Sequence, residues 1–177
     1  MYPRRTSVTL RGFFSGLAEH AFQVRLGVAD PPLIDYISEL LTRFVATDTV
    51  YKVRTPEGRR LGEVVSMVVE AEARVGDARR EIHRHIGDFA LFWAGLYPEA
   101  LRRRQAGTID EFVDYCNQGK RAYHIASTLP VDAAHEDQQA VLERLSRQFE
   151  LCVYGLGEIR REWEQRDDTP GGPVLLE

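Results

Sequence analysis

Apolar residues recur at spacings of three and four along most of the chain, which is the period of an α-helix with one buried side. Gly27 is a suitable residue to end the first helix, and Asp30 and Pro31 are suited to the N-cap and first position of the second. The pattern predicts an all-α fold, a bundle of five or six helices. The segments that carry it are approximately residues 7–25, 31–44, 59–74, 78–96, 108–129 and 133–163.

Two segments depart from the helical pattern. Val50, Tyr51 and Val53 are β-formers followed by the turn sequence Pro56-Glu57-Gly58, which is compatible with a short extended hairpin near residues 49–58. Residues 169–173 hold two prolines and two glycines, a composition typical of frayed chain. We therefore expect a single helical domain over residues 1–166 and a flexible C-terminal tail over residues 167–177.

The fourth predicted helix is the most apolar, and it is expected to be central. One of its sides carries His83 together with the small residues Gly87, Ala90 and Ala94, which would let a neighbouring helix come close. We expect the fourth and fifth helices to pack together near the middle of the bundle.

Composition narrows the class of protein. A chain of 177 residues with 44% hydrophobic residues can bury a core without metal or disulfide support. The net charge of −4 gives no concentrated basic surface, so nucleic-acid binding is not expected. The two cysteines, Cys116 and Cys152, form neither a zinc motif nor a disulfide framework. No apolar stretch approaches the roughly 18 residues of a membrane-spanning helix, and we expect a cytoplasmic protein with no membrane partner.

The first candidate for chemistry is His85, which shares one side of its helix with Glu81 and Asp88. A histidine between two carboxylates can be a general base or a metal ligand; the alternative is a core histidine whose ring is satisfied by a neighbouring carboxylate. The Glu-x-x-His pairs of helical di-iron proteins are absent. We therefore predict no metal site and no cofactor.

The second candidate is Lys120, on an apolar stripe with Cys116 and Tyr123. A lysine there either extends its ammonium group outward or pairs with an acid, and Asp88 is one such acid. The functional alternative is a cation placed in a pocket for an anionic ligand. Lys120 could also lower the pKa of the Cys116 thiol and make it a nucleophile, although a cysteine on an apolar stripe is usually a packing residue.

Two segments, Ile86–Glu99 and Asp114–Tyr123, resemble an uncharacterised family of bacterial helical proteins. That family has a Gly-Asp-x-x-Leu-Phe-x-x-Gly-x-x-Pro-Glu segment and a later Gly-x-x-x-Tyr segment, and the resemblance covers about the middle half of the chain. It implies no activity and no catalytic residue. It does favour treating Asp88, Gly119 and Tyr123 as one unit.

Two classes of function are compatible with these features. The absence of a catalytic motif favours a non-enzymatic module that binds a protein partner or forms a homodimer. The alternative is a small-molecule or metal-binding bundle, with or without enzymatic activity, whose pocket lies between the fourth and fifth helices. The residues expected to line that pocket are His85, Asp88, Trp93, Cys116, Lys120 and Tyr123.

Overall fold

A computed structural model of the chain describes residues 8–45, 64–99, 101, 109–167 and 175–176. Within these residues it contains seven α-helices, which confirms the predicted all-α class but exceeds the predicted five or six. The predicted hairpin near residues 49–58 lies outside the described residues, as does most of the predicted tail. The α-helices are α1 (Leu10–Glu19), α2 (Pro31–Val45), α3 (Val64–Glu72), α4 (Gly76–Leu96), α6 (Ile109–Thr128), α7 (Glu136–Arg147) and α8 (Phe149–Asp167).

Shorter elements complete the described fold. A π-helix, η1 (His20–Arg25), continues α1, and a 3-10 helix, η3 (Ala133–His135), leads into α7. Val8–Thr9 (β1) and Leu175–Leu176 (β2) pair as two parallel two-residue strands.

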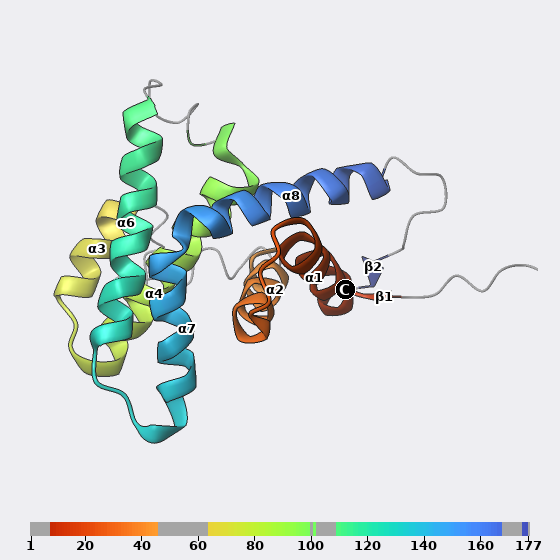
Figure 1. Cartoon of the computed structure of the whole chain (residues 1–177). Coiled ribbons are helices and arrows are strands. Elements are labelled where there is room, and N and C mark those ends of the chain that lie inside the picture. Colours follow the sequence, from red (N-terminus) through yellow and green to blue (C-terminus); the bar gives the residue numbers. More distant parts are fainter. Residues whose placement is uncertain (1–7, 46–63, 100, 102–108, 168–174, 177) are drawn as a thin grey trace, which may run out of the picture.

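The helices surround α4. Its most extensive contacts are with α6, and α3 and α8 also pack on it. As Figure 1 shows, α8 turns away from α7, crosses the bundle and reaches α1. The N-terminal pair α1 and α2 therefore joins the bundle at the far end of α8, and α2 also contacts α4 and α7.

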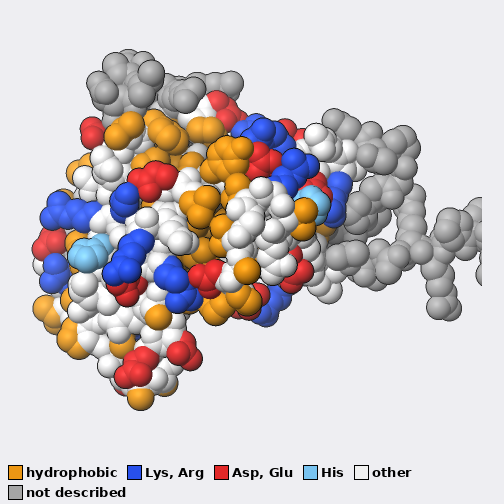
Figure 2. Space-filling view, in the orientation of Figure 1, with side chains coloured by type: hydrophobic (Ala, Val, Ile, Leu, Met, Phe, Trp, Pro, Cys, Tyr) orange, Lys and Arg blue, Asp and Glu red, His pale blue; other side chains and the backbone are white. Residues whose placement is uncertain are grey.

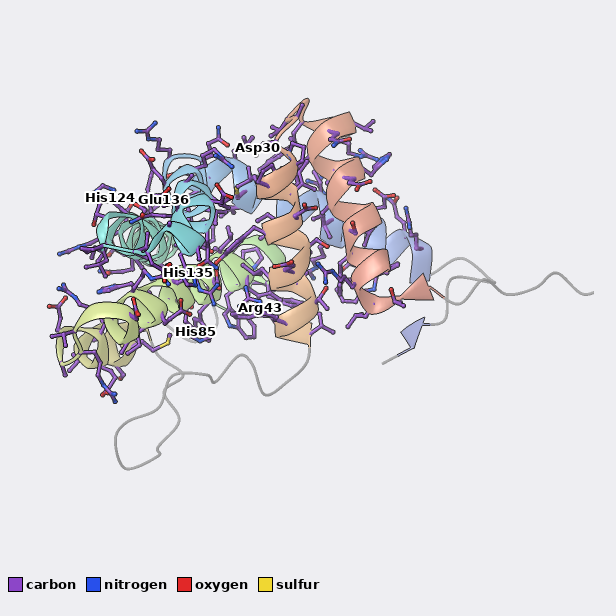
Figure 3. The ribbon with its side chains drawn as sticks, turned by 90° about the horizontal axis from the view of Figure 1, so that it is seen from below. Asp30, Arg43, His85, His124, His135 and Glu136 are labelled. Carbon is purple, nitrogen blue, oxygen red and sulfur yellow. The ribbon has the colours of Figure 1, made fainter. Side chains whose placement is uncertain are left out.

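The predicted boundary between the first two helices is confirmed. Gly27 has φ +67°, a left-handed conformation that glycine adopts without steric cost and that stops the preceding helix. Oδ1 of Asp30 accepts a hydrogen bond of 3.3 Å from the Leu33 N–H at the start of α2. Asp30 also binds Arg144 of α7, with 2.8 Å between Oδ2 and Nε, so the start of α2 is attached to the second half of the chain (Figure 3).

The predicted single helix over residues 133–163 is wrong, because it is broken at Gln148 into α7 and α8. Gln148 has φ −111° and ψ 28°, outside the helical range. Its N–H still donates to the Arg144 carbonyl at 2.8 Å, and its carbonyl accepts from the Cys152 N–H at 2.9 Å. One helix therefore ends where the next begins, and no glycine or proline marks the change of direction.

The prediction that the fourth helix is central is confirmed. Eight consecutive residues of α4, from His85 to Phe92, are buried. The close approach of α6 is confirmed at Gly87. If this residue had a Cβ atom, that atom would lie only 2.5 Å from Cδ1 of Tyr123, so a larger residue would clash with α6. A helix buried on all sides has no exposed face for a polar side chain, so every polar group in this stretch must find a partner inside the protein.

Candidate functional site

The polar centre of the bundle is the carboxylate of Asp88, whose side chain is 0% exposed. Its Oδ1 accepts one hydrogen bond of 2.6 Å from the Tyr36 hydroxyl and another of 2.7 Å from the Tyr123 hydroxyl. Its Oδ2 lies 3.2 Å from Nη2 of Arg43. Since Tyr36 and Arg43 belong to α2 and Tyr123 to α6, this single carboxylate connects three helices.

The surroundings of Asp88 keep both tyrosines protonated. Burial raises the pKa of Tyr36 and of Tyr123 well above the usual value, and the nearby charge of Asp88 raises both further. Their hydroxyls therefore remain hydrogen-bond donors at neutral pH. Arg43, which is 30% exposed, extends from α2 toward α4 and links the buried carboxylate to the protein surface (Figure 3). With both oxygens engaged away from solvent, this arrangement suits a structural connection better than proton transfer.

The predicted pair between Asp88 and Lys120 is wrong. Nζ of Lys120 lies 2.7 Å from Oε1 of Glu150, and the two side chains are 39% and 63% exposed. Residues three apart on a helix differ by about 60° in direction, so Tyr123 faces α4 while Lys120 faces the solvent side. Both alternatives for this lysine are therefore observed together, because its ammonium group extends outward and pairs there with an acid, Glu150.

His85 is a core side chain in contact with aromatic rings. It is 3% exposed, and its ring is stacked on Phe44 of α2 with 5.7 Å between centroids and 24° between planes. The Phe89 ring lies 6.3 Å away. Apolar rings above and beside the imidazole favour the packing role over the role of general base.

Trp93 belongs to a second aromatic group, at the end of α4. Its ring lies 5.6 Å from that of Phe92 and 5.7 Å from that of Tyr97, centroid to centroid. These rings pack on one another, and Arg160 of α8 lies over Tyr97 at 5.2 Å from the ring centroid. The cluster therefore fills the space between α4 and α8.

Lys120 does lower the pKa of Cys116, as the sequence suggested, but other effects are larger. Burial raises the pKa of this thiol to about 11, and the charge of Glu150 raises it as well. A thiol with this pKa is a packing residue rather than a nucleophile at neutral pH.

None of the six predicted pocket residues lines either of the two hollows that are described in this part of the chain. Asp88 and Tyr123 are joined directly by a hydrogen bond, in agreement with treating them as a unit. Two hollows described in the structure are lined by other residues. The first, of about 310 Å³, lies between η1 and α8, and the second, of about 140 Å³, lies between α3, α4 and α6.

Sequence reasoning missed three residues that matter here. Tyr36 and Arg43 are seven apart on α2, so they share one side of that helix. The sequence did contain a signal, because a tyrosine next to the apolar stripe of a helix often makes a polar contact inside the core. His83 was assigned to the small side of α4. It is 2% exposed, and it lines the second hollow.

Among the described residues, no three His, Cys, Asp or Glu side chains come together as a metal site would require. No helix in that part of the chain combines the length and apolarity needed to cross a membrane. On the face drawn in Figure 2, basic and acidic side chains are interspersed with hydrophobic ones.

Comparisons with protein-family models, with curated proteins and with solved structures find no match to this chain. The resemblance to a bacterial helical family stays a prediction.

Proposed function

We propose that this protein is a non-enzymatic module that assembles with itself, through the outer side of α3. The single observation that supports this is the exposure of two valines on that helix, Val65 at 73% and Val69 at 66%. They lie one turn apart on one side, while Met67 and Ala71 on the opposite side are 0% exposed against the bundle. Exposed apolar side chains that adjoin one another are a common mark of an interface.

A second copy is the partner that the charges of α3 favour. The helix has no acidic residue in its first turn, and its terminal residue is Glu72, whose side chain is 59% exposed and lies 3.4 Å from Arg79 of α4. An acid at a helix C-terminus is unfavourable, whereas an acid at an N-terminus is favourable. Two copies of α3 packed antiparallel about a two-fold axis would place each Glu72 beside the N-terminus of the other helix and cover all four valines.

The centre of the bundle supports this proposal over the pocket alternative. Asp88 and Tyr123 are both 0% exposed and hydrogen-bonded to each other. The ring of His85 is stacked on Phe44, and the ring of Trp93 packs on that of Phe92. The hydrogen bonds of the buried Asp88 carboxylate hold the helices in fixed positions, which suits a protein that presents the outer side of α3 to a partner. The proposal needs no catalytic group.

Sedimentation velocity and native mass spectrometry of the full chain across the micromolar range test the proposal. We expect a concentration-dependent dimer that is lost when Val65→Lys and Val69→Lys are combined, because four buried ammonium groups, two from each copy, would repel one another across the axis. The matched control is Val24→Lys, at a valine 70% exposed on η1, which should leave the dimer unchanged. A wild-type protein that stays monomeric, or a dimer that survives the double substitution, would overturn the proposal.

A further inference from the structure

His83 is a buried polar side chain without a hydrogen bond. It lies on α4 and is 2% exposed, yet neither Nδ1 nor Nε2 has a hydrogen-bond partner within the described part of the chain. Buried polar atoms nearly always have a partner in a folded protein, either a protein group, a water or a ligand. The imidazole lines the hollow of about 140 Å³ between α3, α4 and α6, so a ligand there could supply what the protein does not.

The charged side chains that line this hollow are Arg121 of α6 and Glu72 of α3, and Gln118 of α6 lines it as well. Arg79 of α4 lies 3.4 Å from Glu72 and offsets its charge. Burial lowers the pKa of His83, and the charge of Arg79 and that of Arg121 lower it further, against the opposite effect of Glu72. The imidazole is therefore neutral at neutral pH and offers one N–H donor.

The remaining wall of the hollow is apolar. It consists of Val68 of α3 and of Ala122 and Ile125 of α6. A ligand that fits both walls has a negatively charged end and a short apolar end. Arginine binds a planar carboxylate through two parallel hydrogen bonds, and an amide and an imidazole N–H can add to them. A dianion such as phosphate fits less well, because the residues that line the hollow include one cation, Arg121, beside one acid, Glu72.

We propose that the hollow between α3, α4 and α6 is a binding site for a small organic monocarboxylate. Arg121 holds the carboxylate, Gln118 and His83 complete its hydrogen bonds, and the apolar wall covers the short hydrocarbon part. The site uses residues of one copy of the chain, so it does not depend on the proposed dimer.

The bound carboxylate would also change the titration of His83. The groups that face this imidazole are Glu72 of α3, Arg79 of α4 and Arg121 of α6. A carboxylate beside the ring favours its protonated form and raises its pKa. By linkage, affinity should increase as pH falls through the pKa of His83.

The test is an NMR titration of the full chain, labelled so that the His83 ring resonances are observed, with butyrate as the probe. Butyramide, which has nearly the same shape without the charge, is the matched control ligand, and sodium chloride holds the ionic strength constant. We expect a saturable shift of the His83 resonances with butyrate, a rise in the His83 pKa, and at least about tenfold weaker binding of butyramide.

Substitutions locate the site. Arg121→Gln should weaken butyrate binding at least about tenfold, because it removes the charge and the paired donors. Arg147→Gln, at an arginine 75% exposed on α7, is the control and should bind as the wild type does. Urea unfolding of both variants establishes that they are folded. Absence of saturation, equal shifts with butyramide, or unchanged binding in Arg121→Gln would each overturn the proposal.

Discussion

The hydroxyl of Tyr123 on α6 donates a hydrogen bond of 2.7 Å to Oδ1 of Asp88 on α4, and both side chains are 0% exposed. The same oxygen accepts the Tyr36 hydroxyl of α2 at 2.6 Å. Two donors from two helices on one buried acceptor fix the relative positions of all three helices. A buried carboxylate that loses such a donor is not compensated by water, so these bonds should be measurable as stability.

Removal of the Tyr123 hydroxyl should therefore destabilise the protein. We expect Tyr123→Phe to lower the free energy of unfolding by about 1.5–3 kcal/mol, the range for a hydrogen bond to a charged group. Urea unfolding followed by circular dichroism measures it. Tyr154→Phe, at a tyrosine 55% exposed, is the control and should change the stability by less than about 0.5 kcal/mol. Equal stabilities of the two variants would contradict a structural role for the bond.

The two tyrosines should be coupled, because they share one acceptor oxygen. After either Tyr36→Phe or Tyr123→Phe alone, Asp88 keeps one hydroxyl donor, whereas the double variant leaves its Oδ1 without either. A double-mutant cycle should show a combined loss that exceeds the sum of the single losses by about 0.5–3 kcal/mol. Additive losses would mean that the two hydrogen bonds act independently.

Two glycines should respond to the same substitution with opposite signs. In Gly87→Ala the new methyl group would lie 2.5 Å from the Tyr123 ring, and such overpacking costs about 1–3 kcal/mol. In Gly16→Ala no atom lies within 4 Å of the new Cβ, and replacement of a glycine inside α1 should stabilise by about 0.5–1 kcal/mol. Thermal and urea unfolding of both variants checks the contrast, and destabilisation by both would contradict the packing described for α1.

Much of the fold could be predicted from the hydrophobic pattern. The stripe of α4 indicated a central helix, and its small residues indicated the approach of α6, because helix period alone decides which residues share a side. The break at Gln148 could not be predicted in the same way. Val141 and Leu145 before it and Phe149 and Cys152 after it continue one unbroken period, so the pattern does not record a change of axis direction.

The candidate site was only partly predictable for a related reason. A polar residue on a buried stripe indicates that a partner exists, but the sequence does not say which helix supplies it. Lys120 was one possible partner of Asp88, and Tyr123 was expected to act with it as a unit; the structure gives Tyr123 but not Lys120. Tyr36 and Arg43 were not foreseen, because they depend on how α2 docks. That His83 has no hydrogen-bond partner among the described residues could not be recognised before the positions of α3 and α6 were known.

Both thiols should be unreactive in the native protein. Burial raises the pKa of Cys116 to about 11 and that of Cys152 to about 12, so the reactive thiolate is scarce at pH 8. Ellman's reagent should react slowly with the native protein and rapidly after denaturation in urea. Fast native labelling of Cys116 would contradict the packing role. In the unfolded chain the thiols ionise at their ordinary pKa of 9.0, which is below their pKa in the folded protein. The free energy of unfolding should therefore fall as pH rises above 9.0.

The pair of Lys120 and Glu150 should contribute little to stability and should do so only above acidic pH. The hydrogen bond that Glu150 accepts from Lys120 lowers the pKa of the Glu150 carboxyl below its ordinary value of 4.5. Such a contribution is complete above the unfolded pKa and disappears as pH falls through the lower folded value. We expect Lys120→Met to cost less than about 1 kcal/mol at pH 7, since both side chains are partly exposed. A larger loss, or a loss that persists at pH 2, would contradict this interpretation.

The aromatic contact between α1 and α8 has a consequence for synthesis of the chain. The ring of Trp163 lies 6.1 Å from that of Phe13 and 5.2 Å from that of Phe14. Until α8 has left the ribosome, Phe13 and Phe14 lack this aromatic neighbour, although α1 can already pack on α2, with which its contacts are more extensive. Apolar surface that stays exposed during synthesis is prone to misassembly. The packing of α1 is therefore completed only when α8 has been made.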